Sequence, residues 1–436
     1  MSSLARLFLF ILFILCVLCA SAVKCLSLCC GMTTPNADEQ MRRICEKTAE
    51  VFPADEMRRK IEKSLLKGRP LRVKLGVDPT APDVTLGNAV PIWKLRTFQE
   101  MGHVAVLIIG DYTARVGDPS GRNSLRPMLS PEQVDAYAQT YLDQVGKILL
   151  PERLEIRRNS EWLAPMSFMD VLKLLGRMTV SQMLERDDFH RRFEAEAPIS
   201  LHEFLYPLMQ GWDSVVVKAD VELGGSDQRF NLLVGRDLQR AEGQEPQTLL
   251  INPLIAGTDG AKKMSKSAGN YVGITEAANE MFGKVMSVPD SLMPDWATYF
   301  TDLPAARVAE LCDGAKTHPR QAKEEIAKAI IRRYHDSSAA DAAAEEFKKV
   351  FTQRDVPTEM PEVRVESGSM VLAALLSACD AESSKGELRR LVDQGAVSID
   401  GAKVTEPNSP VAIRDGMVVK IGKRRFVRIR LGPSLA

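Results

Sequence analysis

The pattern of hydrophobic and polar residues predicts an alternating α/β unit in the body of the chain. Residues 73–77 (VKLGV) are typical of a short strand, and the turn-forming residues 78–83 (DPTAPD) follow them. Apolar residues then recur at helical spacing over residues 86–101, and residues 104–109 (VAVLII) are continuously apolar, as in a strand buried on both faces. Strand, helix and strand in this order form a βαβ unit, so the expected fold class is α/β with a parallel sheet.

Carboxylates follow both of these predicted strands. Asp78 stands directly after the first strand, and Asp111 and Asp118 follow the second. Ligands of parallel sheets bind at the carboxyl ends of the strands. We therefore expect a binding site at that edge of the sheet.

The pattern changes further along the chain and suggests separate domains. Residues 32–290 form the α/β domain, and residues 291–351, which are rich in Ala, Lys and Glu, predict a helical domain. Residues 352–368 contain two prolines and many charges without periodicity, which indicates a linker. Residues 369–436 contain short strand patterns separated by glycines, so we expect a small α+β domain there.

The first thirty-one residues have a pattern of their own. Residues 7–20 are apolar and uncharged, Arg6 precedes them and small residues follow, as in a secretory signal. The run is short for a membrane span, which needs about 20 residues. Met32 begins an ordinary polar amino terminus. A start codon placed too early, an organelle-directing leader, export and a retained anchor all stay open, and residues 1–31 are left out of the fold prediction.

Composition narrows the class of protein. The 45% hydrophobic and 26% charged residues are typical of a soluble globular protein. After residue 31 the cysteines are Cys45, Cys312 and Cys379, too few for a disulfide framework. We therefore expect a cytoplasmic protein without stable membrane association. Five scattered histidines give no metal-binding cluster, so no protein metal site is expected.

The net charge hides a local basic region. Lys and Arg together number 57, equal to Asp and Glu, so no global excess indicates a nucleic-acid partner. Residues 385–430, however, contain 11 basic and 5 acidic residues. The carboxyl-terminal domain is therefore a candidate for RNA binding, with a solvated basic surface as the alternative.

Two stretches suit the chemistry of a nucleoside triphosphate. Lys263 and Lys266 lie in KMSKS within the polar loop 257–270, where they could neutralise a departing pyrophosphate. Residues 79–88 (PTAPDVTLGN) join the first strand to its helix, and Gly87 would let an adenine ring approach the backbone. A solvated basic loop and an ordinary βα turn are the respective alternatives.

This pair of stretches resembles the two signatures of the class I aminoacyl-tRNA synthetases, His-Ile-Gly-His and Lys-Met-Ser-Lys-Ser. Residues 117–121 (GDPSG), the set Tyr206, Gln210 and Asp213, and residues 224–228 (GGSDQ) narrow the resemblance to the tyrosyl-tRNA synthetases, in a second bacterial branch. The tryptophanyl enzymes are the nearest alternative, because an aspartate can also accept a hydrogen bond from an indole. The resemblance implies a Rossmann-like nucleotide-binding catalytic domain.

The resemblance also implies a role for individual residues. It implies that tyrosine is bound by Asp78, Asp118, Tyr206, Gln210, Asp213 and Gln228. It implies that ATP, with Mg²⁺, is bound by Gly87, Asn88, Asp227, Lys263, Ser265 and Lys266. Its catalytic residues are Thr80, Thr85, Arg122, Arg126, Lys263 and Lys266. Contacts with RNA fall on Arg389, Arg390, Lys423, Arg424 and Arg425.

The physical chemistry of these residues agrees with such roles. Tyr206, Gln210 and Asp213 are spaced by four and three, so they share one helical face. Asp213 could accept a hydrogen bond from a phenol, and Tyr206, Gln210 and Asp118 could hold an ammonium group. A solvated polar helix face is the alternative.

The implied reaction joins L-tyrosine to tRNA(Tyr) through a tyrosyl adenylate. The resemblance further implies a homodimer, with its interface in an insertion at about residues 124–200. It also implies that the helical domain faces the anticodon.

Three positions depart from the family pattern. Thr85 and Asn88 replace the signature histidines, and Lys74 stands where many members have a tyrosine that reaches the substrate hydroxyl. A lost hydrogen bond to a charged group costs about 1.5–3 kcal/mol, so we expect a slower activation step, which Thr85→His should accelerate. The alternative is a catalytically impaired paralogue that serves as an RNA-binding protein.

Overall fold

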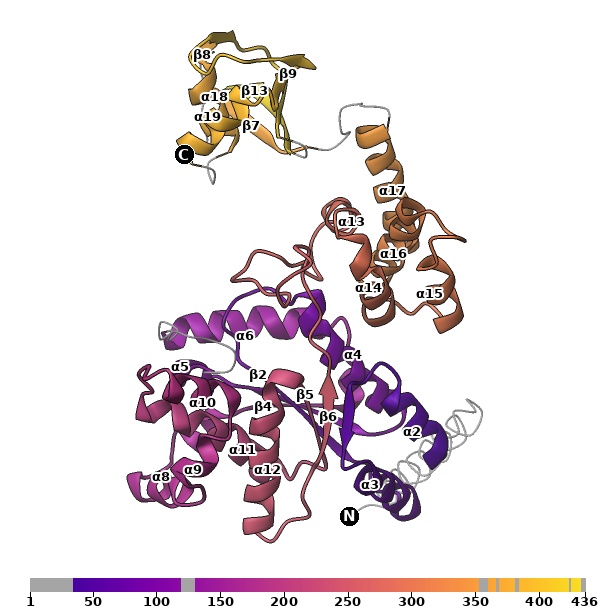
Figure 1. Cartoon of the computed structure of the whole chain (residues 1–436), viewed down its shortest axis with the longest axis vertical. Helices are drawn as coiled ribbons and strands as arrows, with labels where there is room; N and C mark the ends of the chain where they lie inside the picture. The colour runs from indigo at the N-terminus through magenta and orange to yellow at the C-terminus, as the bar shows by residue number, and fades with distance from the viewer. Residues whose placement is uncertain are drawn as a thin grey trace, which may run out of the picture. The chain divides into compact units, whose positions relative to one another are not determined.

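The structure is a computed structural model, and it describes residues 34–118, 130–352, 360–365, 368–380, 384–422 and 425–432. The chain divides into two compact units (Figure 1). Unit 1 comprises the chain up to Glu276 together with Val288–Thr317. Unit 2 comprises Ala277–Ser287 and the chain from His318 onward. The domain boundaries that the sequence suggests stay a prediction.

Unit 1 is built on a six-stranded sheet with the order β1-β6-β5-β2-β3-β4. All neighbouring strands are parallel except β1 and β6. This confirms the α/β class and the βαβ unit. The strands are β1 (Glu50–Phe52), β2 (Arg72–Val77), β3 (Val104–Ile109), β4 (Leu154–Arg158), β5 (Val221–Gly225) and β6 (Thr248–Asn252).

The order of the strands in the sheet predicts where a ligand binds. The chain runs from β2 through β3 to β4 on one side, and β5 and β6 lie on the other side of β2. The order therefore reverses between β2 and β5, and parallel sheets bind ligands at such a switch point. Residues 105–109 of β3 are fully buried, as their apolar sequence predicts.

The helices of unit 1 connect and cover these strands. Those before β5 are α2 (Ala37–Cys45), α3 (Ala54–Lys67), α4 (Leu86–Glu100), α5 (Thr113–Val116), α6 (Pro131–Val145), α7 (Ser160–Leu163), α8 (Phe168–Leu175), α9 (Val180–Met183), α10 (Asp187–Glu194) and α11 (Leu205–Val217). The later ones are α12 (Arg229–Ala241), α14 (Met293–Phe300) and α15 (Ala305–Leu311). Single 3-10 turns lie at η1 (Pro151–Arg153), η2 (Leu201–Phe204), η3 (Ser226–Gln228) and η4 (Asp290–Leu292).

Helices α11 and α12 lie side by side, and glycines permit their close approach (Figure 1). A Cβ on Gly211 of α11 would come within 3.1 Å of the backbone nitrogen of Gly235 on α12. A Cβ on Gly235 would lie 3.1 Å from the Ser214 Oγ of α11. Both distances are too short for an ordinary side chain, so the small residues bring the polar side chains of the two helices into contact.

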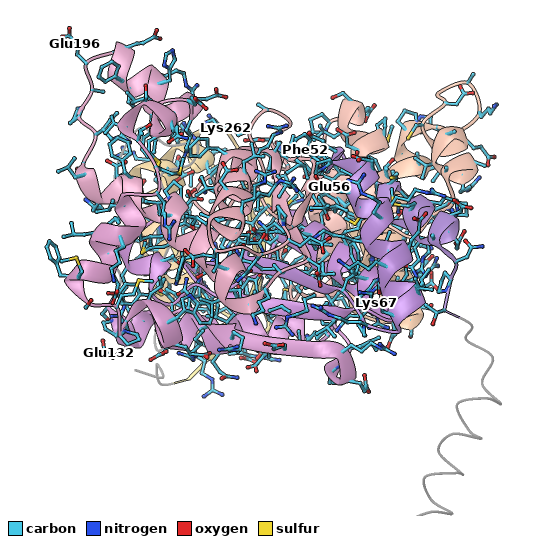
Figure 2. All side chains as sticks on the ribbon, turned by 90° about the horizontal axis from the view of Figure 1, so that it is seen from below. Phe52, Glu56, Lys67, Glu132, Glu196 and Lys262 are labelled. Carbon is cyan, nitrogen blue, oxygen red and sulfur yellow. The ribbon has the colours of Figure 1, made fainter. Side chains whose placement is uncertain are left out.

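The sheet edge at β1 is held by stacked guanidinium groups. Arg229 and Arg236 lie over the ring of Phe52, 5.3 and 5.7 Å from its centroid. Arg236 also pairs with Glu56 at 2.9 Å, and Figure 2 shows Phe52 and Glu56 close together. These contacts attach α12 to the strand and helix at the start of unit 1.

Strand β4 lies inside the stretch 124–200 that the family resemblance treats as an insertion. It pairs in parallel with β3 and is only partly buried, so it lacks the apolar run that marks a central strand. Helices α7–α10 follow β4 in this stretch. Figure 2 shows Glu196, which comes after α10, at the outer edge of unit 1.

Unit 2 contains a helical part and a small sheet domain. The helices α13 (Ala278–Met286), α16 (Pro319–Tyr334) and α17 (Ser337–Thr352) pack on one another. Phe282 and Phe347 stack with ring centroids 5.2 Å apart. These helices enclose a pocket of about 360 Å³, whose lining includes His318, Arg320 and Lys348.

The sheet domain of unit 2 has the order β10-β9-β12-β13-β7, beside a small β11-β8 pair, and this confirms the α+β module. Its strands are β7 (Glu362–Val365), β8 (Ser369–Val371), β9 (Val397–Ile399), β10 (Ala402–Lys403), β11 (Pro410–Ala412), β12 (Val418–Ile421) and β13 (Arg425–Leu431). Helices α18 (Leu372–Cys379) and α19 (Lys385–Asp393) contribute Leu375, Leu376, Leu388 and Val392 to its core.

The structure differs from the sequence prediction at β7. This strand lies within residues 352–368, which the sequence predicts as a linker, and it pairs in parallel with β13. Only Val365 of the four residues is buried, so the apolar signal is too weak to reveal a strand by itself.

The length and the apolar character of the helices bear on whether the chain could cross a membrane. In the parts of the chain that the structure describes, no helix combines the length and the apolar character that crossing a bilayer requires. The apolar run at residues 7–20 lies outside the described residues.

Candidate active site

The candidate site lies where β2, β3 and β5 end. Asp78 follows β2, and its two oxygens accept hydrogen bonds from Thr113 Oγ1 and from the Tyr206 hydroxyl, each at 2.8 Å. A Cβ on Gly110 would lie 2.0 Å from Asp78 Oδ1, so this position needs a glycine. The structure thus brings together Asp78 and Tyr206 as expected, and it adds Thr113 and Gly110, which the sequence analysis missed.

Asp213 is buried in the same region. It accepts hydrogen bonds from Trp162 Nε1 at 2.9 Å and from Asn159 Nδ2 at 3.4 Å. Burial raises the pKa of Asp213 to about 7, although Lys74 and these two donors oppose the shift. A carboxylate has about four acceptor positions, so Asp213 keeps capacity for another donor.

Lys74 is fully buried beside α11. Its Nζ donates to the Gln210 carbonyl oxygen and to Ser214 Oγ, each at 2.8 Å, and lies 2.9 Å from Glu222 Oε1. Three partners match the three hydrogens of an ammonium group. Lys74 therefore joins β2, β5 and α11, and sequence reasoning saw it only as a departure from the family pattern.

The remaining tyrosine-binding candidates form one polar cluster. Gln228 Nε2 donates to Asp118 Oδ2 at 2.8 Å. Asn231 Nδ2 donates to the side-chain oxygens of Gln210 and Gln228, both at 3.0 Å. Asn231 was not among the expected residues, because its role depends on contacts between α11, η3 and α12.

The polar face of α11 is therefore not a solvated surface. Tyr206 and Asp213 are 6% and 3% exposed. Buried polar groups of this kind are kept where they have hydrogen-bond partners. This finding excludes the solvated-face alternative.

Thr85 caps helix α4. Its hydroxyl accepts a hydrogen bond from the Asn88 backbone N–H at 3.1 Å and donates to Asn88 Oδ1 at 2.9 Å. The same Asn88 oxygen accepts the Thr85 backbone N–H at 3.3 Å, which completes a capping box. Thr85 is 1% exposed, whereas Asn88 is exposed. The Thr85 hydroxyl is thus engaged inside the helix turn, and its suggested contact with phosphate stays an untested prediction. Thr80 lies in the preceding turn, where its backbone N–H donates to the Asp78 carbonyl at 2.8 Å.

The loop 257–270 is docked against this turn. Met264 is 4% exposed, and its Sδ accepts the Gly87 backbone N–H at 3.3 Å. Lys266 Nζ donates to the Ala81 carbonyl at 3.1 Å, and Lys263 Nζ lies 2.5 Å from Asp227 Oδ2. The loop, with both lysines, therefore meets the first signature and Asp227, while the Lys263 side chain stays half exposed.

Asn270 holds the loop in shape. Its side-chain oxygen accepts the Ser265 backbone N–H at 2.9 Å, and its Nδ2 donates to Asp259 Oδ2 at 3.0 Å. A Cβ on Gly257 would lie 2.1 Å from the Asn270 carbonyl oxygen, so the loop also needs this glycine. Neither residue was singled out from the sequence, since loop anchors carry no periodic signal.

Burial also lowers the pKa of one lysine in the loop. Desolvation lowers the pKa of Lys266 to about 8, and the nearby Asp83 opposes the shift. The lysine therefore sits in a partly dry position, where a phosphate oxygen would be a stronger partner than in water.

The other expected residues fall elsewhere. Arg122, Arg126, Lys423 and Arg424 lie outside the described residues. Arg389 and Arg390 are exposed on α19, and Arg425 pairs with Asp380 at 2.6 Å. These three belong to unit 2 and not to the site in unit 1.

Two family models match the chain. The model "tRNA synthetases class I (W and Y)" matches residues 66–352, and the model "Tyrosine--tRNA ligase SYY-like C-terminal domain" matches residues 351–429. The tyrosine–tRNA ligase of Symbiobacterium thermophilum is 49% identical over 405 residues, which cover 92% of this chain and 99% of that protein. That of Moorella thermoacetica is 48% identical over 393 residues, which cover 89% and 95%.

Solved structures resemble the chain in fold. A C-terminally truncated mitochondrial tyrosyl-tRNA synthetase of Aspergillus nidulans has a TM-score of 0.59 at 22% identity, over 74% of this chain and 95% of that one. The tyrosyl-tRNA synthetase of Archaeoglobus fulgidus complexed with L-tyrosine has a TM-score of 0.57 at 22% identity, over 71% of this chain and 100% of that one.

Proposed function

The chain belongs to the tyrosine–tRNA ligases of class I, and from this membership we propose how its residues bind and activate tyrosine. The protein is an ATP-dependent ligase that joins L-tyrosine to tRNA through a tyrosyl adenylate and releases AMP and diphosphate. Its carboxyl-terminal domain and its relatives are of the tyrosine type, which decides against the tryptophanyl alternative. Nothing among the relatives favours an impaired paralogue.

One observation supports the assignment of residues best. Asp78 and Asp227 follow strands β2 and β5, and Asp118 is tied to Gln228 beside Asp227. Asp213 on α11 shares the Asn159 amide with Thr113, the hydrogen-bond donor to Asp78, and the loop with Lys263 and Lys266 is docked on the same edge. Carboxylates suit an amino acid's ammonium and hydroxyl groups, while lysines suit phosphates. Both substrates of an activation step therefore have matching partners at one edge of the sheet.

Tyrosine binds with its ring along α11. Asp213 accepts the phenolic hydrogen, and Asp118, with Tyr206 and Gln210, receives the ammonium group. Asp78 holds the Tyr206 hydroxyl in place at 2.8 Å, and Gln228 orients Asp118. A site that pairs a phenolic hydroxyl rejects phenylalanine strongly, because Asp213 would remain buried without that partner.

The tyrosine carboxylate attacks the α-phosphate of ATP. It needs no general base, since an α-carboxyl group is ionised near neutral pH. Asp227 and Asn88 contact the nucleotide, and Gly87 leaves room for adenine. Because Lys263 pairs with Asp227 in the ligand-free chain, ATP must replace this ion pair when it binds.

Pyrophosphate leaves under a clamp of cationic side chains. Lys263 and Lys266 neutralise the developing charge, and Ser265 helps to bind it. Arg122 and Arg126 belong to the same proposed clamp, with Thr80 and Thr85 in the supporting turn. Mg²⁺ would arrive with ATP and shield the phosphate charge. It would be held mainly by phosphate oxygens, because the lysines of the clamp have no acceptor atoms to offer a metal.

Transfer to tRNA(Tyr) involves unit 2. Arg389 and Arg390 are exposed on α19, so they can meet phosphates, together with Arg425, Lys423 and Arg424. The pocket beside Phe347 is lined by the cationic side chains Arg320 and Lys348, which suit the phosphates of the anticodon region.

A homodimer would cover an apolar face of unit 1. Phe168 and Leu172 on α8 are 78% and 42% exposed, and Val180, Phe193 and Leu201 are 63%, 62% and 82% exposed. Where exposed apolar side chains of this size form one patch, that patch is typical of a protein–protein interface. We place the dimer interface on this face, and we place the enzyme in the cytoplasm.

Tyrosine-dependent exchange of labelled pyrophosphate into ATP tests the proposal. We expect exchange with L-tyrosine, very little with phenylalanine or tryptophan, and loss of exchange in Lys266→Ala and Asp213→Ala. Absence of exchange in the unaltered chain, or equal exchange with tryptophan, would contradict it.

A further inference from the structure

A buried polar cluster lies behind the tyrosine site. Arg186 precedes α10, Asp188 lies on α10 and Asn231 on α12, with exposed fractions of 5%, 6% and 1%. Arg186 Nε and Nη2 donate to the two oxygens of Asp188 at 2.6 and 3.0 Å. Its Nη1 donates to Asn231 Oδ1 at 3.2 Å. The Asp188 carboxylate thus neutralises the guanidinium charge, and a third N–H of Arg186 is directed at Asn231. Arg186 Nη2 also lies 3.9 Å from Asp118 Oδ1.

This contact fixes the orientation of the Asn231 amide. A guanidinium group only donates hydrogen bonds, so the Asn231 atom that faces Arg186 must be the oxygen. The Asn231 nitrogen therefore faces the other way, where its two hydrogens reach Gln210 Oε1 and Gln228 Oε1, each at 3.0 Å. Because arginine stays protonated at all ordinary pH values, the orientation does not depend on pH.

Asn231 in turn fixes the orientation of both glutamines. Their oxygens must face Asn231, so their nitrogens point away from Asn231. Gln228 Nε2 accordingly donates to Asp118 Oδ2 at 2.8 Å, and Gln210 Nε2 lies 3.4 Å from Glu222 Oε1. A single asparagine therefore determines which end of two amides points toward the site.

The orientation of the Gln210 amide decides whether it can accept a hydrogen bond from an ammonium group. An ammonium group has only donors, so every group around it must offer an acceptor. A carbonyl oxygen has two lone pairs, and Asn231 occupies one of those on Gln210 Oε1, which leaves the other for the substrate. If the Gln210 amide turned over, it would present N–H groups to a cation, which repel it.

We propose that Asn231 is a positioning residue for the amino group of tyrosine, acting through Gln210 and Gln228 and held in place by Arg186. This inference rests on the proposed function, because it takes the bound amino acid to be tyrosine in the pocket of α11. Asn231 does not touch the substrate and is not a catalytic residue.

Variants at this position separate positioning from packing. Asn231→Ala removes both donors, and Asn231→Ser keeps one hydroxyl donor that can hold one glutamine. Gln239→Ala is a matched control, because Gln239 is a fully buried amide on the same helix, and its Nε2 donates to the Ala219 carbonyl at 2.9 Å. Thermal unfolding of each full-length variant measures how much of any effect is structural.

Three ligands report on the amino group in the binding experiment. L-tyrosine carries both charged groups, tyramine carries the ammonium without the carboxylate, and 3-(4-hydroxyphenyl)propionate carries the carboxylate without the ammonium. We expect Asn231→Ala to weaken the binding of tyrosine and of tyramine by about 10- to 100-fold. This is the usual effect of losing a hydrogen bond to a charged group, here the ammonium group of the ligand. The propionate and the KM for ATP should not change, and Asn231→Ser should lie between.

The control variant and the contrary outcomes separate a positioning role of Asn231 from a purely structural one. Gln239→Ala should lower the unfolding temperature without favouring one ligand over another. Equal weakening of all three ligands by Asn231→Ala, or no weakening, would overturn the positioning role. Pyrophosphate exchange by the unaltered chain, measured in parallel, tests the proposed function by itself, so the two failures can be told apart.

Discussion

Thr85 shows how a single residue can support a helix where the family pattern has a histidine. Its hydroxyl closes a capping box with Asn88, so Thr85→Ala should destabilise the chain by about 1 kcal/mol, and Thr85→Ser should retain the stability. Urea unfolding measures both. The sequence suggested that Thr85→His would accelerate activation. Because Thr85 is 1% exposed, we now expect this variant to lose the cap and to slow pyrophosphate exchange, and a faster exchange would contradict the capping role.

Asp213 should make tyrosine binding depend on pH. Burial raises the pKa of Asp213 to about 7, while Lys74, Trp162 and Asn159 favour its charged form and Glu222 opposes it. Below this pKa the carboxyl group is neutral and accepts the phenolic hydrogen more weakly. We expect kcat/KM for tyrosine to rise between about pH 6 and 8 with a midpoint near the pKa of the free enzyme. Asp213→Asn should remove this rise, and a flat profile in the unaltered enzyme would exclude the carboxylate as the acceptor.

The same shift has a consequence for stability. The folded chain holds the Asp213 proton up to a pKa of about 7, whereas the unfolded chain releases it near the ordinary aspartate pKa of 3.8. Between these values the folded state binds more protons, so this group's contribution to the free energy of unfolding falls as the pH rises. The enzyme therefore ionises Asp213 for substrate recognition at a cost in stability, as is common in active sites.

At the scale of elements, the first turn of α4 is where the two signatures meet. A Cβ on Gly87 would lie 3.5 Å from the Met264 Cβ and 3.6 Å from Thr85 Oγ1, which are ordinary contacts. The fold itself therefore does not require glycine there. We expect Gly87→Ala to leave the stability unchanged or to raise it by up to about 1 kcal/mol, the helix propensity difference.

The same variant should bind ATP less well, since the added methyl group occupies the space proposed for adenine. A tenfold higher KM for ATP corresponds to about 1.4 kcal/mol, and exchange kinetics at varied ATP measure it. An unchanged KM for ATP in Gly87→Ala would show that adenine does not approach this turn.

The elements also show what a sequence can and cannot predict. Strands β2 and β3 follow from short, nearly continuous buried runs, and helix α4 follows from apolar residues at helical spacing. β4 and β7 are only partly buried and depend on pairing with distant strands, so local patterns do not reveal them. The motif residues were found through a resemblance. Lys74 and Asn231 act through partners on other elements, and Asn270 acts through irregular contacts within its own loop. No periodic pattern reports such contacts.

At the scale of the whole molecule, the residues proposed for activation and those proposed for tRNA binding belong to different units. The site residues lie in unit 1, and the exposed Arg389 and Arg390 lie in unit 2. The double variant Arg389→Glu with Arg390→Glu should therefore leave pyrophosphate exchange intact. Aminoacylation should show a KM for tRNA raised by about tenfold or more, with a weaker dependence on salt, because phosphate contacts are lost. A matched loss of exchange would mean that the two activities are not separable.

The exposed apolar face of α8–α10 and η2 leads to a final prediction about the assembly of two chains. Phe168 and Leu172 lie on one side of α8, four residues apart, and Phe168 and Leu201 are the most exposed of the face at 78% and 82%. If two chains cover this face, Phe168→Glu with Leu201→Glu would bury charges at the interface and convert the dimer to a monomer. Sedimentation at several protein concentrations measures the change, and thermal unfolding shows whether each chain stays folded. Because both residues are exposed within one chain, their replacement should not disturb the core of unit 1. A variant that sediments like the unaltered chain would move the interface elsewhere, whereas a monomer that still exchanges pyrophosphate would show that one unit 1 holds a complete activation site.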